Sequence, residues 1–295
     1  MPVPDPAVAH FGRDGMRRIS ATGAYGVRLP ENSRATLEGV GVPLHVAPYF
    51  RASGKEDALA LGVFAGHHGL PRPATESERW LRIGTDGLAH LCVRPDGALQ
   101  AVFLENNEYD GAEPGMFVSS DITAFNASLV VLDRRLPVIA VSPGLSVAAA
   151  AFRELNAELR QIDAAAFAER ESWWPRVLDD VRHSLNFPFS SAFEYVDEAG
   201  EKQTVTDATG PGRAHPEELI WQRLSGEGIA PEQVRRVYCE LEPCMMPGHY
   251  CAVWMQRTFP QAEFTHSFDY GSDAESREAG LKELITHAAR QAGGR

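Results

Sequence analysis

The chain has 295 residues, 44% of them hydrophobic, and its 28 Lys and Arg against 40 Asp and Glu give a net charge of −12. This length suggests two domains, and the apolar content suffices for folded cores, which excludes an intrinsically disordered chain. No apolar run reaches transmembrane length and no secretory signal opens the sequence, so we expect a cytoplasmic protein without membrane contact. The acidic charge, with no Lys- or Arg-rich run, argues against tight binding of duplex DNA.

The first part of the chain mixes short strands with helices. Residues 1–25 are rich in proline at their start, and we expect them to be flexible. Asp121 has the side chain and position of a helix N-cap. The expected elements are a helix at 59–68, strands at 80–83, 88–93, 99–104 and 116–119, and helices at 121–132 and 148–170. This pattern predicts an α+β domain over residues 26–175.

A second pattern follows a linker that we expect at residues 176–185. Two strands form a hairpin around the turn at 197–200, and helices and strands then alternate to the end of the chain. The expected elements are strands at 193–196 and 203–205, a helix at 217–224, a strand at 234–241, a helix at 250–259, a strand at 263–270 and a helix at 276–291. The order β-β-α-β-α-β-α predicts an α/β domain at 186–295, with a mixed sheet and flanking helices.

Three residues with metal-binding side chains stand at the starts of two helices of this second domain. They are His215 at the first helix and Cys244 and Cys251 at the next. One imidazole and two thiolates suit Zn²⁺ and leave a fourth position for water, as in catalytic sites. Glu217 follows His215 closely enough to lie beside that water as a proton shuttle, the arrangement of zinc nucleobase deaminases. Glu218 is expected to point away from it, by about 100° of helix rotation.

The other two cysteines carry no such pattern. Cys92 and Cys239 fall on expected strands, where a free cysteine behaves as a small core hydrophobe. Four cysteines are too few for a disulfide scaffold, so the three that cluster near residue 245 indicate a metal site in a reducing compartment.

The second domain resembles the nucleic acid/nucleotide deaminases of bacterial polymorphic toxin systems. The resemblance lies in His-Pro-Glu-Glu at 215–218, Glu-Leu-Glu-Pro-Cys at 240–244 and Pro-Gly-His-Tyr-Cys-Ala at 247–252. It covers about residues 186–295. It implies a cytidine-deaminase-like fold, one Zn²⁺ held by His215, Cys244 and Cys251, and Glu217 as the catalytic acid and base.

One spacing departs from this family. The two cysteines usually have two residues between them, whereas six residues separate Cys244 from Cys251. His249 is therefore the alternative to Cys251 as the last ligand, or a substrate contact. We also expect substrate contacts from Asn186 and Phe187, ahead of the first strand, and from Tyr270, at the end of the last strand.

The first domain resembles the SUKH superfamily of immunity proteins over about residues 30–170. The resemblance lies in Trp-Leu-Arg-Ile-Gly-Thr-Asp-Gly at 80–87, the Pro-Asp-Gly hairpin at 95–97, and Phe-Val-Ser-Ser at 117–120 ahead of Phe125 and Leu129. It implies a binding module without catalytic residues, whose partner is a toxin or another conflict-system protein. Bacterial chains that fuse such a module to a deaminase are similar.

Two functions follow from the sequence. The first is a zinc-dependent hydrolase that deaminates cytosine or adenine in a nucleotide or a single-stranded nucleic acid, fused to an immunity-type domain. The alternative is a non-catalytic immunity or binding protein whose second domain is a zinc-stabilised platform. The sequence leaves open which base, sugar or polymer is the substrate.

Overall fold

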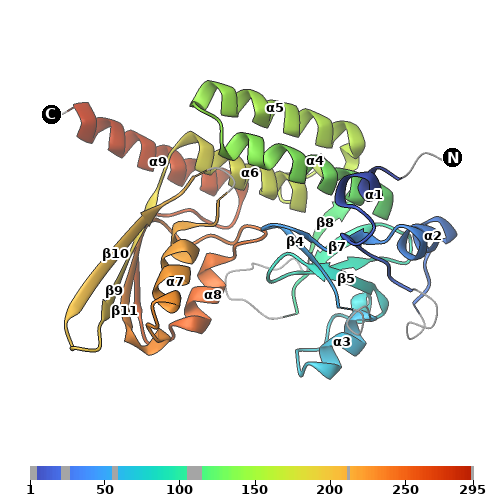
Figure 1. The fold of residues 1–295 in the computed structure, drawn as a ribbon, viewed down its shortest axis with the longest axis horizontal. Helices are drawn as coiled ribbons and strands as arrows, with labels where there is room; N and C mark the ends of the chain where they lie inside the picture. Colours follow the sequence, from blue (N-terminus) through green and yellow to red (C-terminus); the bar gives the residue numbers. More distant parts are fainter. Residues whose placement is uncertain (1–4, 21–26, 55–58, 105–114, 211–212, 294–295) are drawn as a thin grey trace.

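The structure is a computed structural model that describes residues 5–20, 27–54, 59–104, 115–210 and 213–293. Figure 1 shows two lobes side by side, one built on the strands of the first part of the chain and one on those of the second part. Helices and sheets are mixed throughout, which confirms the expected α+β class at that level. None of the helices in the described ranges is long and apolar enough to cross a membrane.

The first lobe contains a six-stranded antiparallel sheet in the order β3-β4-β5-β6-β7-β8. Its strands are β3 (His45–Val46), β4 (Phe50–Ala52), β5 (Leu81–Thr85), β6 (His90–Val93), β7 (Leu99–Val102) and β8 (Gly115–Ser119). The expected hairpin is confirmed between β6 and β7. In its turn, Asp96 accepts a hydrogen bond from the backbone nitrogen of Ala98 at 3.1 Å, and Gly97 adopts a φ of 92°.

Within the described residues, the first lobe also contains six helices and a separate two-stranded sheet of β1 (Met16–Arg17) and β2 (Val42–Pro43). The helices are α1 (Pro6–Phe11), α2 (Glu31–Gly39), α3 (Leu61–His67), α4 (Ile122–Ala140), α5 (Leu145–Ile162) and α6 (Trp173–Asn186), with short 3-10 turns at Ser77–Arg79 and Ala164–Phe167. Asp121 is the N-cap of α4, as predicted, because its Oδ1 accepts from the backbone nitrogens of Thr123 and Ala124 at 2.8 Å.

Two segments differ from the sequence-based expectation. Of the N-terminal segment expected to be flexible, residues 5–20 contain α1 and β1, and the buried Ala7 side chain packs α1 against the lobe, while residues 1–4 and 21–25 lie outside the described residues. The expected linker at 176–185 is part of helix α6, whose Val177 and Val181 are buried in the first core. Because this helix has an apolar face, it packs against the first core and does not form an extended linker between the two domains.

The second lobe is a four-stranded mixed sheet in the order β10-β9-β11-β12, in which only the β11–β12 pair is parallel. Its strands are β9 (Ser190–Val196), β10 (Lys202–Ala208), β11 (Val234–Leu241) and β12 (Glu263–Phe268). Its helices are α7 (Pro216–Gly226), α8 (Cys251–Thr258) and α9 (Ala274–Gly293), with a 3-10 turn at Pro231–Gln233. Helix α7 contacts β9 and β10, and α9 contacts β11 and β12.

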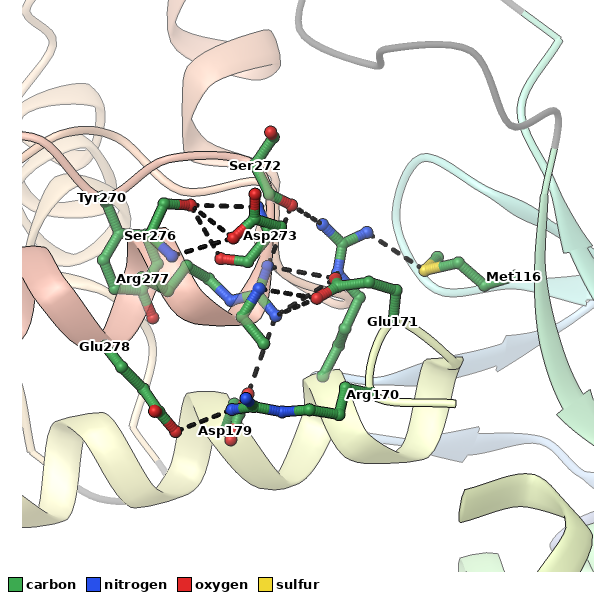
Figure 2. A network of polar contacts seen from close by, with 12 residues as sticks. Met116, Arg170, Glu171, Asp179, Tyr270, Ser272, Asp273, Ser276, Arg277 and Glu278 are labelled. Atoms are coloured by element: carbon green, nitrogen blue, oxygen red, sulfur yellow. Dashed lines mark hydrogen bonds and ion pairs between the residues drawn. The ribbon is translucent and has the colours of Figure 1, made fainter. Parts of the chain in front are cut away.

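A polar network fastens α9 to the first lobe, as Figure 2 shows. Arg277 of α9 is buried, and its guanidinium donates to Glu171 Oε2 at 3.2 Å and to the Ser272 carbonyl at 3.0 Å. The Oε1 atom of Glu171 accepts from the backbone nitrogen of Ala274 at 2.6 Å. Glu171, from the turn before α6, therefore places a carboxylate at the N-terminus of α9 and a counter-charge beside Arg277.

Candidate active site

His215, Cys244 and Cys251 converge at one end of the second sheet. His215 is the N-cap of α7, Cys244 follows β11, and Cys251 begins α8. The Nδ1 atom of His215 lies 3.4 Å from Cys244 Sγ and 3.5 Å from Cys251 Sγ. Bond lengths of Zn²⁺ to nitrogen and sulfur in a tetrahedral site imply a separation of about 3.6 Å between such ligands. The three buried donors, which all lie within 4.8 Å of one another, therefore fit a zinc ion.

The loop between the two cysteines accommodates their long spacing. The carbonyl of Met246 accepts from the backbone nitrogens of both His249 and Tyr250 at 3.1 Å, and Gly248 and Tyr250 adopt φ values of 84° and 47°. The loop closes where the backbone nitrogen of Ala252 donates to the Cys244 carbonyl at 3.2 Å. Left-handed backbone at a non-glycine residue is costly and persists where the surroundings impose it. The six intervening residues thus return the chain to the site.

Glu217 lies beside these donors without belonging to their group. Its side chain is buried, and its Oε1 accepts a hydrogen bond from Ser191 Oγ at 2.7 Å. Its Oε2 lies 3.7 Å from Cys251 Sγ, and the candidate metal group does not include it. A fixed carboxylate at this distance can exchange protons with a molecule bound next to the metal donors.

The titration of the three donors is strongly perturbed. Burial disfavours the His215 imidazolium, but the charges of Cys244 and Asp180 outweigh it and raise the pKa of His215 well above its usual value. Burial also opposes the Cys244 thiolate, yet a hydrogen bond from Cys251 and the charge of His215 hold the pKa of Cys244 well below its usual value. Burial and Cys244 raise the pKa of Cys251. A metal that binds here therefore displaces protons from His215 and Cys251.

His249 does not join the thiols. Its ring stacks on that of His215, with centroids 3.7 Å apart and planes 7° apart, and its Nδ1 lies 2.7 Å from Glu218 Oε2. Glu218 also accepts from the backbone nitrogen of His215 at 2.8 Å. Glu218, which is half-buried, thus contacts His215 and His249 in the site, contrary to the expectation that it points away. Burial and His215 lower the pKa of His249, but Asp180 and Glu218 outweigh them and raise it to about 9.

Asp180 of α6 is a site residue that sequence reasoning missed. Its Oδ1 lies 3.0 Å from His215 Nε2, and its Oδ2 accepts a hydrogen bond from Tyr49 at 2.7 Å. Burial opposes its charge, but His249 and His215 hold the pKa of Asp180 well below the usual range. The charged residues around Asp180 do not indicate this contact in the sequence, because no sequence motif with a defined spacing links Asp180 to His215.

A small cavity adjoins these groups. Its volume of about 10 Å³ holds roughly one water molecule. Its lining residues are Asp180, His183, Phe189, His215, Glu217, Leu241, Glu242, Cys244 and Tyr270.

The predicted substrate residues have different positions relative to this cavity. Tyr270 lines it, and its hydroxyl lies 2.5 Å from His183 Nδ1. Phe187 packs against the second core, and Phe189, which the sequence did not single out, lines the cavity. Asn186 ends α6, and its side chain lies outside the described part of the structure. Cys239 is buried in the second core and Cys92 in a satellite core of the first lobe, as expected.

Two family models match the chain. The model of the SUKH-4 immunity protein family matches residues 4–180, and that of the Xanthomonas-like deaminase family matches residues 188–287. This layout confirms the two resemblances found in the sequence. Searches of curated proteins and of solved structures gave no match.

Proposed function

Because the chain belongs to the SUKH-4 immunity protein family and continues into a deaminase-like domain, we propose that this second domain is a zinc-dependent nucleobase deaminase. The observation that carries the proposal is the buried group of His215, Cys244 and Cys251 with Glu217 beside it. These donors hold one Zn²⁺, which supplies a Lewis acid that makes water nucleophilic at neutral pH. The thiolates must stay reduced to bind metal, so a reducing compartment such as the cytoplasm suits the site.

Glu217 moves the protons of the reaction. Water attacks the ring carbon that carries the amino group, and Glu217 takes a proton from that water. Glu217 delivers this proton to the ring nitrogen. It then takes the second proton from the added hydroxyl and passes it to the amino nitrogen, so that a carbonyl forms, the carbon–nitrogen bond breaks and ammonia leaves. The hydrogen bond from Ser191 fixes the carboxylate in place for both transfers.

The order of elements supports a cytidine-deaminase-like fold for this domain. The chain runs β9-β10-α7-β11-α8-β12-α9, and the proposed metal donors stand at the N-cap of α7, in the loop after β11 and at the first residue of α8. We place the boundary between the domains after α6, at residues 186–188, since α6 packs in the first core.

The substrate is a nucleotide or a single-stranded nucleic acid. The net charge of −12 disfavours the salt-dependent grip that duplex DNA requires. Tyr270 and Phe189 line the cavity and provide aromatic surfaces for a base, while His249 stacks on His215 instead of facing the substrate. Cytosine and adenine both carry the amino group that this chemistry removes.

The size of the cavity favours one alternative. A space for roughly one water molecule does not admit a pyrimidine ring without movement of its walls. In the alternative function, the second domain is a metal-stabilised platform and the immunity domain binds a protein partner, such as a toxin of a bacterial conflict system.

Metal content and ammonia release of the full chain distinguish these functions. We expect one Zn²⁺ per chain by elemental analysis, and release of ammonia from at least one member of a panel of nucleosides, nucleotides and single strands. Cys244→Ala should lose the metal, while Cys92→Ala, which removes a buried cysteine of the other lobe, should keep it.

The catalytic role is tested at matched zinc content. Glu217→Gln keeps the shape of the side chain but cannot carry the proton, so ammonia release should fall by about 10²–10⁴-fold or more. Glu227→Gln, an exposed residue at the end of the same helix, should remain active. Zinc binding without ammonia release from any substrate would favour the platform. Wild type without zinc would contradict the metal site.

A further inference from the structure

Asp180 is a buried carboxylate that the proposed chemistry does not use. It lies on α6, and the family model of the immunity domain ends at this residue. Its Oδ1 lies 3.0 Å from His215 Nε2 in the second domain. Its Oδ2 lies 2.7 Å from the Tyr49 hydroxyl in the first domain and 3.3 Å from His249 Nε2 in the second. The first domain thus reaches the side of the imidazole that faces away from the thiols.

The geometry of His215 explains what this contact does. Its Nδ1 faces both cysteine sulfurs, so metal binding requires a lone pair on Nδ1 and places the ring proton on Nε2. The Nε2–H group then donates to Asp180 Oδ1, while the Tyr49 hydroxyl donates to Asp180 Oδ2 and fixes the carboxylate. Carboxylates in this position orient a ligating histidine and raise its basicity.

We propose that Asp180, held by Tyr49, is a positioning residue for the metal-binding His215, so that the immunity domain completes the metal site of the deaminase domain. The inference rests on the proposed function, because it assumes that His215 is a ligand. In this role Asp180 and Tyr49 need not contact the reacting atoms. Both act through the orientation and proton of His215.

The loop between the two cysteines supports this dependence on the first domain. Gly248 lies so close to the first lobe that a Cβ atom there would come within 3.2 Å of the Pro48 backbone. The ring of Tyr49 meets that of His249 edge to face, 5.9 Å between centroids, and the Tyr250 hydroxyl donates to Asp86 at 2.7 Å. The residues that separate Cys244 from Cys251 therefore dock on the domain that supplies Asp180.

Zinc affinity of the full chain tests the proposal without any substrate. A chromophoric chelator that competes for Zn²⁺ measures the dissociation constant of each variant. We expect Asp180→Ala to weaken Zn²⁺ binding about 10–100-fold, the usual effect of removing the partner of a ligating histidine. Asp180→Asn keeps an acceptor for Nε2–H and should recover part of this loss. Tyr49→Phe, which removes only the hydroxyl, should lose less than Asp180→Ala.

Asp179→Asn is the matched control. Asp179 precedes Asp180 on α6 but pairs with Arg182 at 2.9 Å and Arg277 at 3.7 Å. Its substitution weakens the junction between the lobes while leaving His215 Nε2 untouched, so Zn²⁺ affinity should stay at the wild-type value. Thermal unfolding of the metal-free forms shows whether a variant has lost its fold instead of its ligand geometry.

Three results would overturn the proposal. Asp180→Ala with wild-type Zn²⁺ affinity, while Cys244→Ala loses the metal, would remove the positioning role and leave the proposed function intact. Equal losses for Asp179→Asn and Asp180→Ala would make the effect one of domain packing. Two Zn²⁺ per wild-type chain, with one lost in Asp180→Ala, would make Asp180 a ligand in the group that it forms with His215 and His249.

Discussion

Asp86 is a buried carboxylate where the two domains meet. It accepts hydrogen bonds from Trp173 Nε1 at 2.8 Å, from the Tyr250 hydroxyl at 2.7 Å and from the backbone nitrogen of Ala89 at 2.9 Å. Burial nevertheless dominates and raises the pKa of Asp86 to about 6. The folded protein therefore holds a proton that the unfolded chain has released between about pH 4 and 6. This difference lowers the free energy of unfolding as the pH rises through that window.

Replacing this carboxylate should remove that part of the pH dependence. Asp86→Asn keeps an acceptor oxygen but does not titrate. A shift of two pH units corresponds to about 3 kcal/mol at most, so between pH 4 and 7 the stability of Asp86→Asn should improve relative to wild type by about 1–3 kcal/mol. Urea unfolding at several pH values measures both curves. Parallel curves for the two proteins would show that Asp86 does not titrate in this range.

At the scale of single residues, the sequence predicts the candidate metal ligands better than the residues that hold those ligands in place. His215, Cys244, Cys251 and Glu217 carry specific chemistry in a specific order, and the structure brings them together. Their roles stay predictions until metal is measured. The partners of His215 could not be predicted, because Asp180 lies 35 positions away and Tyr49 a further 131 positions from Asp180. Such contacts depend on how α6 packs, which no local pattern encodes.

Helix α9 approaches the end of β12 unusually closely at Gly280. A Cβ atom at this position would lie 1.7 Å from the carbonyl oxygen of Asp269, so the backbone would have to move. We expect Gly280→Ala to lower the free energy of unfolding by about 1–3 kcal/mol, as overpacking does. In Gly226→Ala, at the end of α7, the new Cβ meets nothing within 4 Å. Better helix propensity should make that change neutral, or stabilising by up to about 1 kcal/mol.

Chemical denaturation of both variants measures these changes in the free energy of unfolding, which should have opposite signs. Equal effects would contradict the close approach of α9 to the turn after β12. That approach matters for the site, since this turn carries Tyr270 into the cavity lining.

The helices before the boundary show where local patterns fail. The sequence predicts helices at 121–132 and 148–170, whereas the structure has α4 to Ala140, α5 to Ile162 and α6 from Trp173. Arg135 and Glu158 form an ion pair between α4 and α5 that favours the longer α4. Asp163 ends α5 and turns its carboxylate to Ser119 and Ser120 at the end of β8. Helix length here follows tertiary contacts that periodicity does not contain.

On the scale of the whole molecule, α6 belongs to both lobes. Its Trp173, Trp174 and Val177 lie in the first core, while its Asp180 and His183 line the cavity of the second lobe. Glu171, just before α6, anchors the start of α9. The two family matches therefore meet at a helix that is part of the first fold and part of the second site. A domain boundary drawn within this helix therefore divides both the first core and the candidate site of the second lobe.

Truncation separates these two roles. A fragment of residues 1–187 retains every buried residue of the first core except Tyr250, whereas a fragment of residues 1–175, the boundary that the sequence predicts, also loses the buried side chains of Val177, Leu178 and Val181. Burial of each such side chain contributes about 1.5–3 kcal/mol. The combined loss is comparable with the total stability of a small domain, about 5–15 kcal/mol. We therefore expect cooperative thermal unfolding of fragment 1–187 by circular dichroism, and no cooperative transition for fragment 1–175. Cooperative unfolding of both at similar temperatures would contradict the assignment of α6 to the first core, and α6 would then depend on the second domain for its place.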